Sequence, residues 1–290
     1  MVSTSNNHAF DVGTGGILDT MDALKTRGMA FAGTGMTMGE ASSATIMATT
    51  AGRVGLVAVA AGFTRDGGAA TPDRPGVAEL RKAAGGGVDA DDVERTLQAI
   101  REGRKQSDIL IAYLHDHLWE PDPWMTSAWK RTFARACIDA GASLFVSHGA
   151  PLLQGIEMYR AKPLFHGLGS FIFQTKKADD YYGPWAWQTL MAECRFDRGD
   201  FVGARLVPVQ LNPTGVGGPS DLATRGRPAL AGPSEAKAIL ERLAFLSARL
   251  GHALVFRACS DQVESPASET HAEKQEDSAA VLMQSERDSL

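Results

Sequence analysis

Five of the seven histidines follow short apolar runs that are typical of buried strands. They are His8, His115, His117, His148 and His166. Ligands of open α/β sheets bind outside the carboxyl ends of the strands, so side chains at such ends share one crevice. Imidazole is the commonest metal ligand and a proton shuttle near neutral pH. The pattern predicts a metal or acid–base site, although each histidine taken alone is better interpreted as an ordinary core or surface residue.

The first of these histidines lies in the triplet Asn6-Asn7-His8. Asparagine is a poor strand former, and two in succession favour a special turn. The amide oxygen of Asn7 is a neutral ligand for a hard metal, and His8 supplies a proton donor beside it. Asp11 has two interpretations, because it either orients His8 through a hydrogen bond or caps the following helix.

Two tryptophans lie close to the segment His115-Asp116-His117 in the sequence. Trp119 and Trp124 come shortly after it, together with the acidic residues Glu120 and Asp122. This arrangement suggests the wall of a substrate pocket, and the alternative is an ordinary packed loop. No GxSxG motif indicates a serine nucleophile.

Apolar periodicity and turn residues predict the elements that position these side chains. Helices are expected over 14–27, 91–104 and 124–140, and a further helix is expected after a cap at Ser234. Strands are expected at 2–5, 44–49, 53–60, 108–114, 143–147, 156–159, 163–165, 171–173, 188–196, 201–211 and 252–256. Helices and strands alternate at first and consecutive strands follow, which predicts an α/β or mixed layered fold.

Composition and charge exclude several classes of protein. Of 290 residues, 44% are hydrophobic and 22% charged, which excludes a fully disordered chain. Residues 261–290 contain eight acidic and two basic residues, so this tail holds all of the net charge of −5. The nearly neutral remainder lacks the basic footprint of a nucleic-acid-binding protein. The tail is Ser-rich and lacks aromatic residues, so we expect it to be disordered, including its only apolar run, Val281-Leu282-Met283.

Neither a membrane-spanning stretch nor a signal segment is evident, so the chain is assigned to the cytoplasm by default. The three cysteines Cys137, Cys194 and Cys259 are far apart and odd in number, which argues against a disulfide framework. Cys137 is interpreted as a small core residue of a helix.

Four ordered blocks, spread over roughly residues 2–210, resemble the CapA-type poly-γ-glutamate capsule-synthesis family. The segment from Asn6 to Asp11 resembles the NNHxxD signature of that family. His115-Asp116-His117 lies where many members have a short His-containing motif, and Ser147-His148-Gly149 is similar to the GHxPH stretch. Residues 155–159 (GIEMY) and 163–171 (PLFHGLGSF) resemble the GIEiY and PIFYxLGNF blocks.

The resemblance implies kinship with the calcineurin-like metallophosphatases, whose layered β-sandwich is flanked by helices and carries two metals at the strand ends. It implies a divalent metal (Mn, Zn or Fe) and an acyl, phosphoryl or peptide-type substrate. The implied metal ligands are Asn7, His115 and His148, and the implied catalytic residues are His8, Asp11 and His117. The residues implied to touch the substrate or support the site are Glu157, His166, Trp119 and Glu120.

The sequence also departs from the family pattern. The chain begins five residues before Asn6, whereas family members carry a strand with an Asp and a second acidic motif there. Pro151 replaces the second His of GHxPH, Ser170 replaces the Asn of LGNF, and His166 replaces a Tyr. We therefore expect one domain over 1–256 that lacks its first strands, with a partner covering the exposed sheet edge, and an acidic tail over 257–290.

Three functions remain open at this point. The first is a metal-dependent hydrolase or transferase of capsule biosynthesis. The second is a non-catalytic family member that acts in binding or assembly. The third is a metal-dependent peptide epimerase, because paired histidines around a metal also suit proton abstraction.

Overall fold

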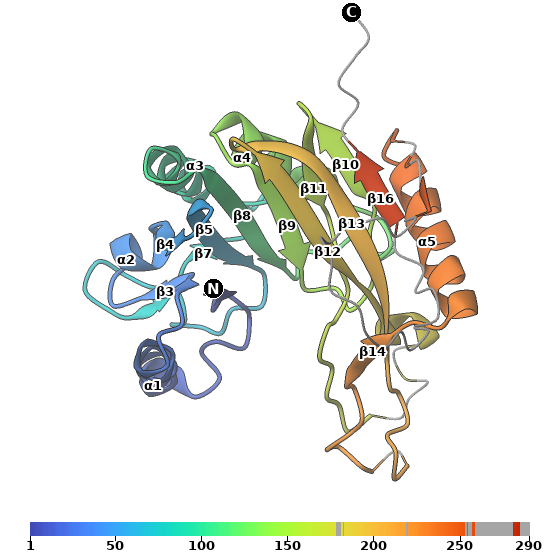
Figure 1. Ribbon diagram of the computed structural model, residues 1–290. Coiled ribbons are helices and arrows are strands. Elements are labelled where there is room, and N and C mark those ends of the chain that lie inside the picture. Colours follow the sequence, from blue (N-terminus) through green and yellow to red (C-terminus); the bar gives the residue numbers. More distant parts are fainter. Residues whose placement is uncertain are drawn as a thin grey trace, which may run out of the picture.

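The chain folds around two β-sheets that share a core, as seen in Figure 1. The computed structural model describes residues 1–177, 181, 183–218, 220–252, 254, 257–258 and 281–284. Within them, one sheet has seven strands and the other has five, and two further pairs of short strands complete the architecture. The predicted fold class, a layered α/β fold with helices flanking the sheets, is confirmed.

The seven-stranded sheet has the order β10-β11-β9-β8-β5-β4, with β7 also pairing with β5. Its strands are β4 (Thr45–Thr49), β5 (Gly52–Ala61), β7 (Glu79–Leu80), β8 (Ile109–Asp116), β9 (Leu144–His148), β10 (Ile156–Tyr159) and β11 (Lys162–Phe165). Strands β5, β8, β9 and β11 are parallel to one another. Helices α3 (Ala90–Arg104) and α4 (Ala128–Asp139) make the crossovers that parallel neighbours require, so the carboxyl ends of β5, β8 and β9 meet at one edge.

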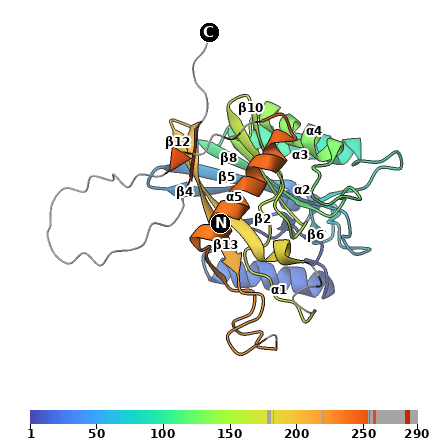
Figure 2. The same cartoon turned by 90° about the vertical axis from the view of Figure 1, so that its right-hand side faces the viewer.

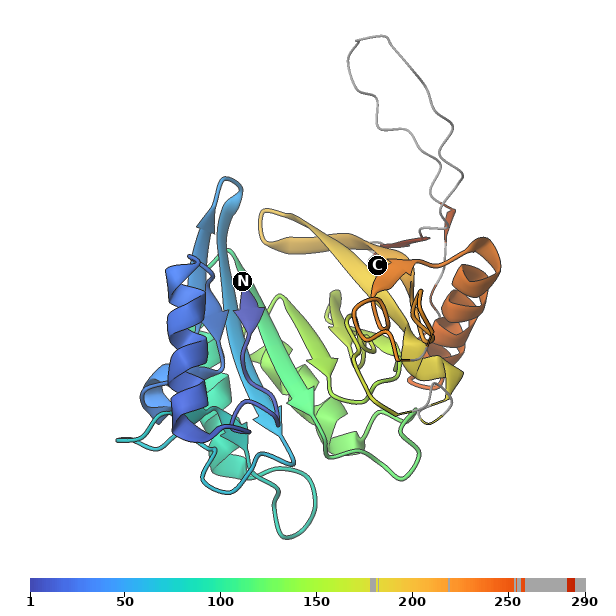
Figure 3. The same cartoon turned by 90° about the horizontal axis from the view of Figure 1, so that it is seen from below.

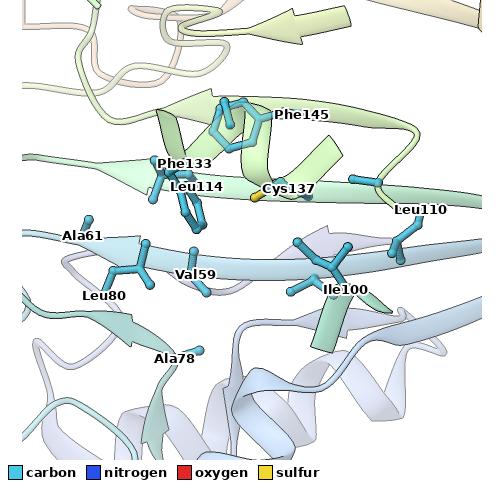
Figure 4. Packing of buried hydrophobic residues seen from close by; sticks show 14 of the residues in the cluster. Val59, Ala61, Ala78, Leu80, Ile100, Leu110, Leu114, Phe133, Cys137 and Phe145 are labelled. Carbon is cyan, nitrogen blue, oxygen red and sulfur yellow. The ribbon is translucent and has the colours of Figure 1, made fainter. Parts of the chain in front are cut away.

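Helices α3 and α4 cover one face of this sheet. Alternate residues of β5 and β8, such as Val59 and Leu114, pack against Ile100 of α3 and Phe133 of α4. Figure 4 shows these side chains interdigitating, with the sulfur of Cys137 among them. Cys137 is fully buried, which confirms its predicted place in the core.

The opposite face of the sheet packs against the second sheet and α5 (Pro233–Ala248). Leu144 of β9, Leu206 of β13 and Ile239 of α5 belong to this second core. Figure 3 shows α1 and α5 on opposite flanks with the strands between them, and Figure 2 views the α5 side. The five strands are β12 (Gln188–Asp197), β13 (Asp200–Leu211), β14 (Pro228–Leu230), β15 (Arg257–Ala258) and β16 (Val281–Gln284).

The amino-terminal segment adds short elements near β5. Strand β1 (Val2–Ser3) pairs in parallel with β2 (Phe31–Ala32), and helix α1 (Gly13–Thr26) connects them. Strand β3 (Thr34–Gly35) pairs with β6 (Gly76–Val77), and the remaining helices are α2 (Met38–Ser42) and the 3₁₀ helix η1 (Pro184–Trp187).

Several predicted elements differ from the structure. Residues 171–173 do not form a strand, since 171 and 172 are bends and 173 is irregular. Helix α4 begins at Ala128, since Asp122 and the prolines on either side of it favour a turn before it. Gly232 precedes α5 in the cap position, and the hydroxyl of Ser234 donates to Glu235 and not to the backbone. His252 and Leu254 are not in a strand, and the other residues of the strand predicted at 252–256 lie outside the described residues.

The predicted tail differs at one point that the structure describes. Its apolar run lies in β16, which pairs antiparallel with Gly203–Leu206 of β13 and with β15. An apolar run of three residues was too short to distinguish from a solvated segment, whereas an available strand edge satisfies its backbone groups. The rest of 261–290 lies outside the described residues.

Candidate functional site

The side chains at the carboxyl end of β8 point alternately to the two faces of the sheet. Successive residues of a strand point to opposite faces, so His115 and Asp116 separate. Asp116 follows the buried series Leu110, Ala112 and Leu114 and faces α4, where it pairs with Lys130. His115 lies on the face that turns away from these helices, and His117 follows it just beyond the strand end.

The turn after β1 brings Asn7 to His115. Thr4 anchors this turn through a hydrogen bond from Oγ1 to the Ala32 carbonyl, at 3.0 Å, in the neighbouring strand. The side-chain oxygen of Asn6 accepts the backbone N–H of His8 at 2.9 Å, which confirms the predicted special turn. The result places Asn7 Oδ1 2.9 Å from His115 Nε2, across 108 residues of sequence.

His115 and His117 face each other through their Nε2 atoms, which lie 3.1 Å apart. The Trp119 ring stacks on the His117 ring, with centroids 4.9 Å apart, and the Phe63 ring meets His117 edge-on at 6.1 Å. Phe63 has a φ of 58°, which is an unusual conformation for a bulky residue. Aromatic rings therefore flank His117 on two sides.

His148 joins the cluster from the adjacent strand. It pairs in register with His115 across the parallel strands β8 and β9, and its ring lies against Tyr113 at 5.7 Å. Its Nδ1 atom is buried and has no hydrogen-bond partner in the part of the chain that is described. A buried, unpartnered nitrogen is costly, so it needs an explanation such as a ligand.

Burial holds these imidazoles neutral. Burial, together with the neighbouring His117, His148 and His8, lowers the pKa of His115 to about 3. Burial also lowers the pKa of His148 to about 4 and that of His117 below its usual range. Neutral imidazoles keep a lone pair on one nitrogen, which is the form that binds metals.

His8 stands beside this cluster and is mostly exposed. Its Nδ1 lies 2.9 Å from Asp11 Oδ2, and Asp11 also forms an ion pair with Arg65 at 2.8 Å. Of the two interpretations of Asp11, the structure favours the one in which it orients His8, because Val12 precedes α1 in the cap position. The hydrogen bond with His8 and the neighbouring Arg65 cation lower the pKa of Asp11.

A buried ion pair lies directly behind the His-Asp-His segment. Lys130 Nζ is 2.9 Å from Asp116 Oδ2, and both side chains are almost completely buried. Lys130 also donates to Gln154 Oε1 at 2.7 Å and to the His166 carbonyl at 3.2 Å. Asp116 Oδ1 accepts the Leu118 N–H at 2.8 Å, so this pair fixes the backbone from which His117 and Trp119 extend.

Glu157 and His166 form a second cluster, with partners of their own. Glu157 is fully buried and accepts hydrogen bonds from Arg131 at 2.7 Å and from Arg135 at 2.6 Å, and His166 Nε2 lies 3.2 Å from it. Burial raises the pKa of Glu157, but the hydrogen bonds from His166 and the arginines outweigh it and lower the pKa to about 2. Neither residue has a contact with Asn7 or with the three clustered histidines among the described interactions.

Glu120 is exposed and has no described contact with the histidine cluster. A cavity of about 620 Å³ lies at the other end of β8, lined by residues that include Arg53, Arg104 and Ile109. None of the predicted site residues lines it.

Lys130, Tyr113 and Phe63 were missed by the sequence analysis. Lys130 is buried on one side of α4 together with Phe133, Ala134, Cys137 and Ile138. A lysine at i, i+3, i+4 spacing with apolar residues was the available signal. Phe63 follows Gly62, and both residues have a positive φ. A single glycine in the sequence does not indicate that the residue after it also adopts this conformation.

Two features, a ready-made metal-binding group and a membrane-spanning helix, are absent from the described residues. No group of three or more His, Cys, Asp or Glu side chains is arranged to hold a metal ion by itself. No helix in that part of the chain is long and apolar enough to cross a membrane.

Comparison with known proteins gives consistent relatives. An uncharacterised protein of Sinorhizobium fredii, y4sH, is 27% identical over 87% of this chain and 73% of its own length. A Mycobacterium tuberculosis protein named as a probable polyglutamine synthesis accessory protein is 29% identical, over 72% of this chain and 54% of its own. The poly-γ-glutamate (PGA) biosynthesis protein CapA of Bacillus subtilis is 30% identical, over 60% of this chain and 42% of its own.

Among solved structures, a phosphatase from Mycoplasma pneumoniae overlaps 58% of this chain and 50% of its own, with 10% identity and a TM-score of 0.31. The pattern of the family described as bacterial capsule synthesis protein PGA_cap matches residues 1–175. This match covers more than half of the chain and includes Asn7, His115, His117 and His148. The chain belongs to the PGA_cap family of bacterial capsule synthesis proteins.

Proposed function

We propose that this chain is a metal-dependent hydrolase or transferase of poly-γ-glutamate or capsule biosynthesis, acting on a phosphoryl, acyl or peptide-type substrate. The observation that carries the proposal is the cluster formed by Asn7, His115 and His117 with the unpartnered nitrogen of His148. The relatives named for polyglutamine and PGA biosynthesis support the biological setting.

The donor set fits a divalent ion that accepts nitrogen ligands, such as Mn, Zn or Fe. Ligand atoms about 2.0–2.2 Å from one metal ion lie about 3 Å from each other, and two of the proposed ligand atoms, Asn7 Oδ1 and His115 Nε2, lie 2.9 Å apart. The histidines alone do not form a closed site, so the proposal depends on Asn7 as the additional ligand. Asn7, His115 and His148 would hold the ion, with His117 beside them, and the ion would supply Lewis-acid chemistry for a substrate oxygen and a water.

The remaining chemistry belongs to side chains of this chain. His8, oriented by Asp11 through Nδ1, presents its Nε2 as a proton donor to a leaving group. Trp119 and Phe63 flank His117 and limit the access of water to that ring. Asp116 and Lys130 hold the backbone of the segment that carries His117.

Metal analysis of the purified chain tests this proposal. The protein is incubated with Mn, Zn or Fe, desalted and analysed by inductively coupled plasma mass spectrometry, alongside the His115→Ala, Asn7→Ala and His8→Ala variants. The wild type and His8→Ala are expected to retain metal, and the other two variants to lose it, because Asn7 and His115 are proposed ligands and His8 is not. The His252→Ala variant is the matched control, since His252 lies near Glu157 and outside the cluster.

Activity separates the catalytic function from binding alone. With a nitrophenyl phosphodiester as a model substrate, His8→Ala is expected to retain metal and to lose at least about 100-fold in turnover, a typical loss for a general acid. Wild-type protein without metal, or His115→Ala with as much metal as the wild type, contradicts the proposal. Metal retention without turnover of any phosphoryl, acyl or peptide substrate favours the non-catalytic function.

A further inference from the structure

A second unusual arrangement of side chains surrounds Arg242 on α5. The Arg242 guanidinium carbon lies 3.9 Å from the centroid of the Trp185 ring and 5.7 Å from that of Trp124. The two tryptophan rings meet edge-to-face at 6.1 Å. Trp185 is 42% exposed, so this aromatic clamp opens to solvent. Figure 1 locates α5 on the flank of the molecule beside the second sheet.

Arg242 has no acidic partner among the described residues. Its one described hydrogen bond runs from Nη1 to Gln188 Oε1, at 2.6 Å. Guanidinium carries five N–H donors at the edge of one plane, and a tryptophan ring that lies over the guanidinium carbon, as Trp185 does, does not use these donors. Burial lowers the pKa of Arg242 from its usual value, which indicates a cation partly removed from water without a compensating charge.

The clamp is connected to the histidine cluster through one short segment. Trp119 stacks on His117, and Trp124 lies five residues further along the chain. Their Cα atoms are at most ~18 Å apart, because an extended residue spans about 3.6 Å. Gln154 Nε2 donates to the carbonyls of Pro123 and Met125, at 2.8 and 3.2 Å, which fixes the position of this segment beside Trp124.

We propose that Arg242, held against Trp124 and Trp185, binds a carboxylate of an extended polyanionic substrate whose reacting bond lies at the histidine cluster. A carboxylate matches the single positive charge and the planar edge of the guanidinium, and a phosphate would need a second cation to balance its charge. The choice of a carboxylate polymer rests on the proposed function. The clamp would therefore select the substrate and leave the chemistry to the cluster.

Titration calorimetry with a short γ-linked glutamate peptide tests this inference. The wild type is compared with Arg242→Gln and Arg242→Lys, and Arg249→Gln is the matched control at the carboxyl cap of the same helix, where Arg249 lies over Phe245. Arg242→Gln is expected to weaken binding at least about tenfold, because a charge-assisted pair is lost. Arg242→Lys is expected to weaken binding as well, since an ammonium lacks the planar edge, and Arg249→Gln is expected to bind like the wild type.

Two ligand controls identify the recognised group. The wild type is expected to bind the peptide with amidated carboxylates at least about tenfold more weakly than the unmodified peptide. Arg242→Gln is expected to bind the two peptides equally. Inorganic phosphate is expected not to compete, and competition that depends on Arg242 would overturn the assignment to carboxylate. Arg242→Lys is designed to retain the fold by keeping the charge and the aliphatic stem, and its melting temperature verifies this.

Wild-type protein that does not bind the peptide, or either Arg242 variant binding as tightly as the wild type, overturns the inference. These outcomes are separable from a failure of the proposed function. Metal content depends on Asn7 and His115 and is measured in the same preparations. If Arg242→Gln retains metal normally and binds the peptide as tightly as the wild type, the inference about Arg242 is rejected and the proposed function is not.

Discussion

Two clusters of polar side chains in the described part of the chain differ in whether a paired charge lies at their centre. In the first, His115, His117 and His148 are neutral and His148 retains an unpartnered nitrogen. In the second, Glu157 is ionised and accepts hydrogen bonds from two arginines. The second cluster also contains an unpartnered nitrogen, because Nδ1 of the buried His166 has no hydrogen-bond partner among the described residues. A buried charge that has its partners stabilises a fold, whereas a cluster of neutral imidazoles without such a charge has capacity for a ligand.

The buried pair of Lys130 and Asp116 lies between these clusters and touches both. Asp116 separates His115 from His117, and Lys130 donates to the carbonyl of His166, whose ring contacts Glu157. The pair belongs to the stabilising kind, since each charge has its partner within 2.9 Å. The comparison therefore assigns stability to the residues behind the histidines and ligand binding to the histidines themselves.

The largest effect on stability is expected from Lys130→Met. Removing one partner of a buried ion pair leaves Asp116 uncompensated, and such changes cost about 3–5 kcal/mol. Urea unfolding of this variant measures the loss, with Lys105→Met on the exposed surface of α3 as the control, expected to cost less than about 1 kcal/mol. Adding Asp116→Asn is expected to recover part of the loss, and equal losses in Lys130→Met and Lys105→Met contradict the assignment.

Glu157→Gln is expected to have the next largest effect. The loss of the carboxylate weakens the hydrogen bonds from Arg131 and Arg135, but both arginines are about one-third exposed and recover some hydration. We expect a cost of about 3 kcal/mol, at the low end for a buried pair. Glu94→Gln, which breaks an exposed pair with Arg101 on α3, is the control in the same unfolding experiment.

The effect of Glu157→Gln is expected to depend on pH. The folded pKa of Glu157, about 2, lies below the usual value of 4.5, so its ionised form stabilises the fold above pH 4.5. This contribution is lost as the pH falls from about 5 through about 2. The difference in unfolding free energy between wild type and variant is therefore expected to be full at pH 7 and to shrink toward pH 2, and a constant difference would exclude Glu157 as the titrating group.

Residues near one another in sequence were predicted better than the contacts between distant segments. Their positions after apolar runs placed His115 and His148 at strand ends, and the structure pairs them in register because the register of β8 and β9 follows from the buried side chains. The contact of Asn7 with His115 depended on the resemblance to a family and not on spacing. The burial of Lys130 and the clamp around Arg242 depend on tertiary packing across α4, α5 and the segment with Trp124, which periodicity alone does not specify.

The smallest expected effect has the opposite sign. In His148→Leu, a leucine replaces a half-buried ring whose buried Nδ1 atom has no described partner, and removing that unpaired group outweighs the change in shape. We expect metal-free His148→Leu to be more stable than the metal-free wild type by about 1 kcal/mol in urea unfolding, whereas His252→Leu, near the paired Glu157, is expected not to gain stability. A gain in stability together with lost metal retention is the expected signature of a side chain retained for a ligand. A loss of stability in His148→Leu as large as that in Glu157→Gln would place His148 among the structural residues and remove the distinction between the two clusters.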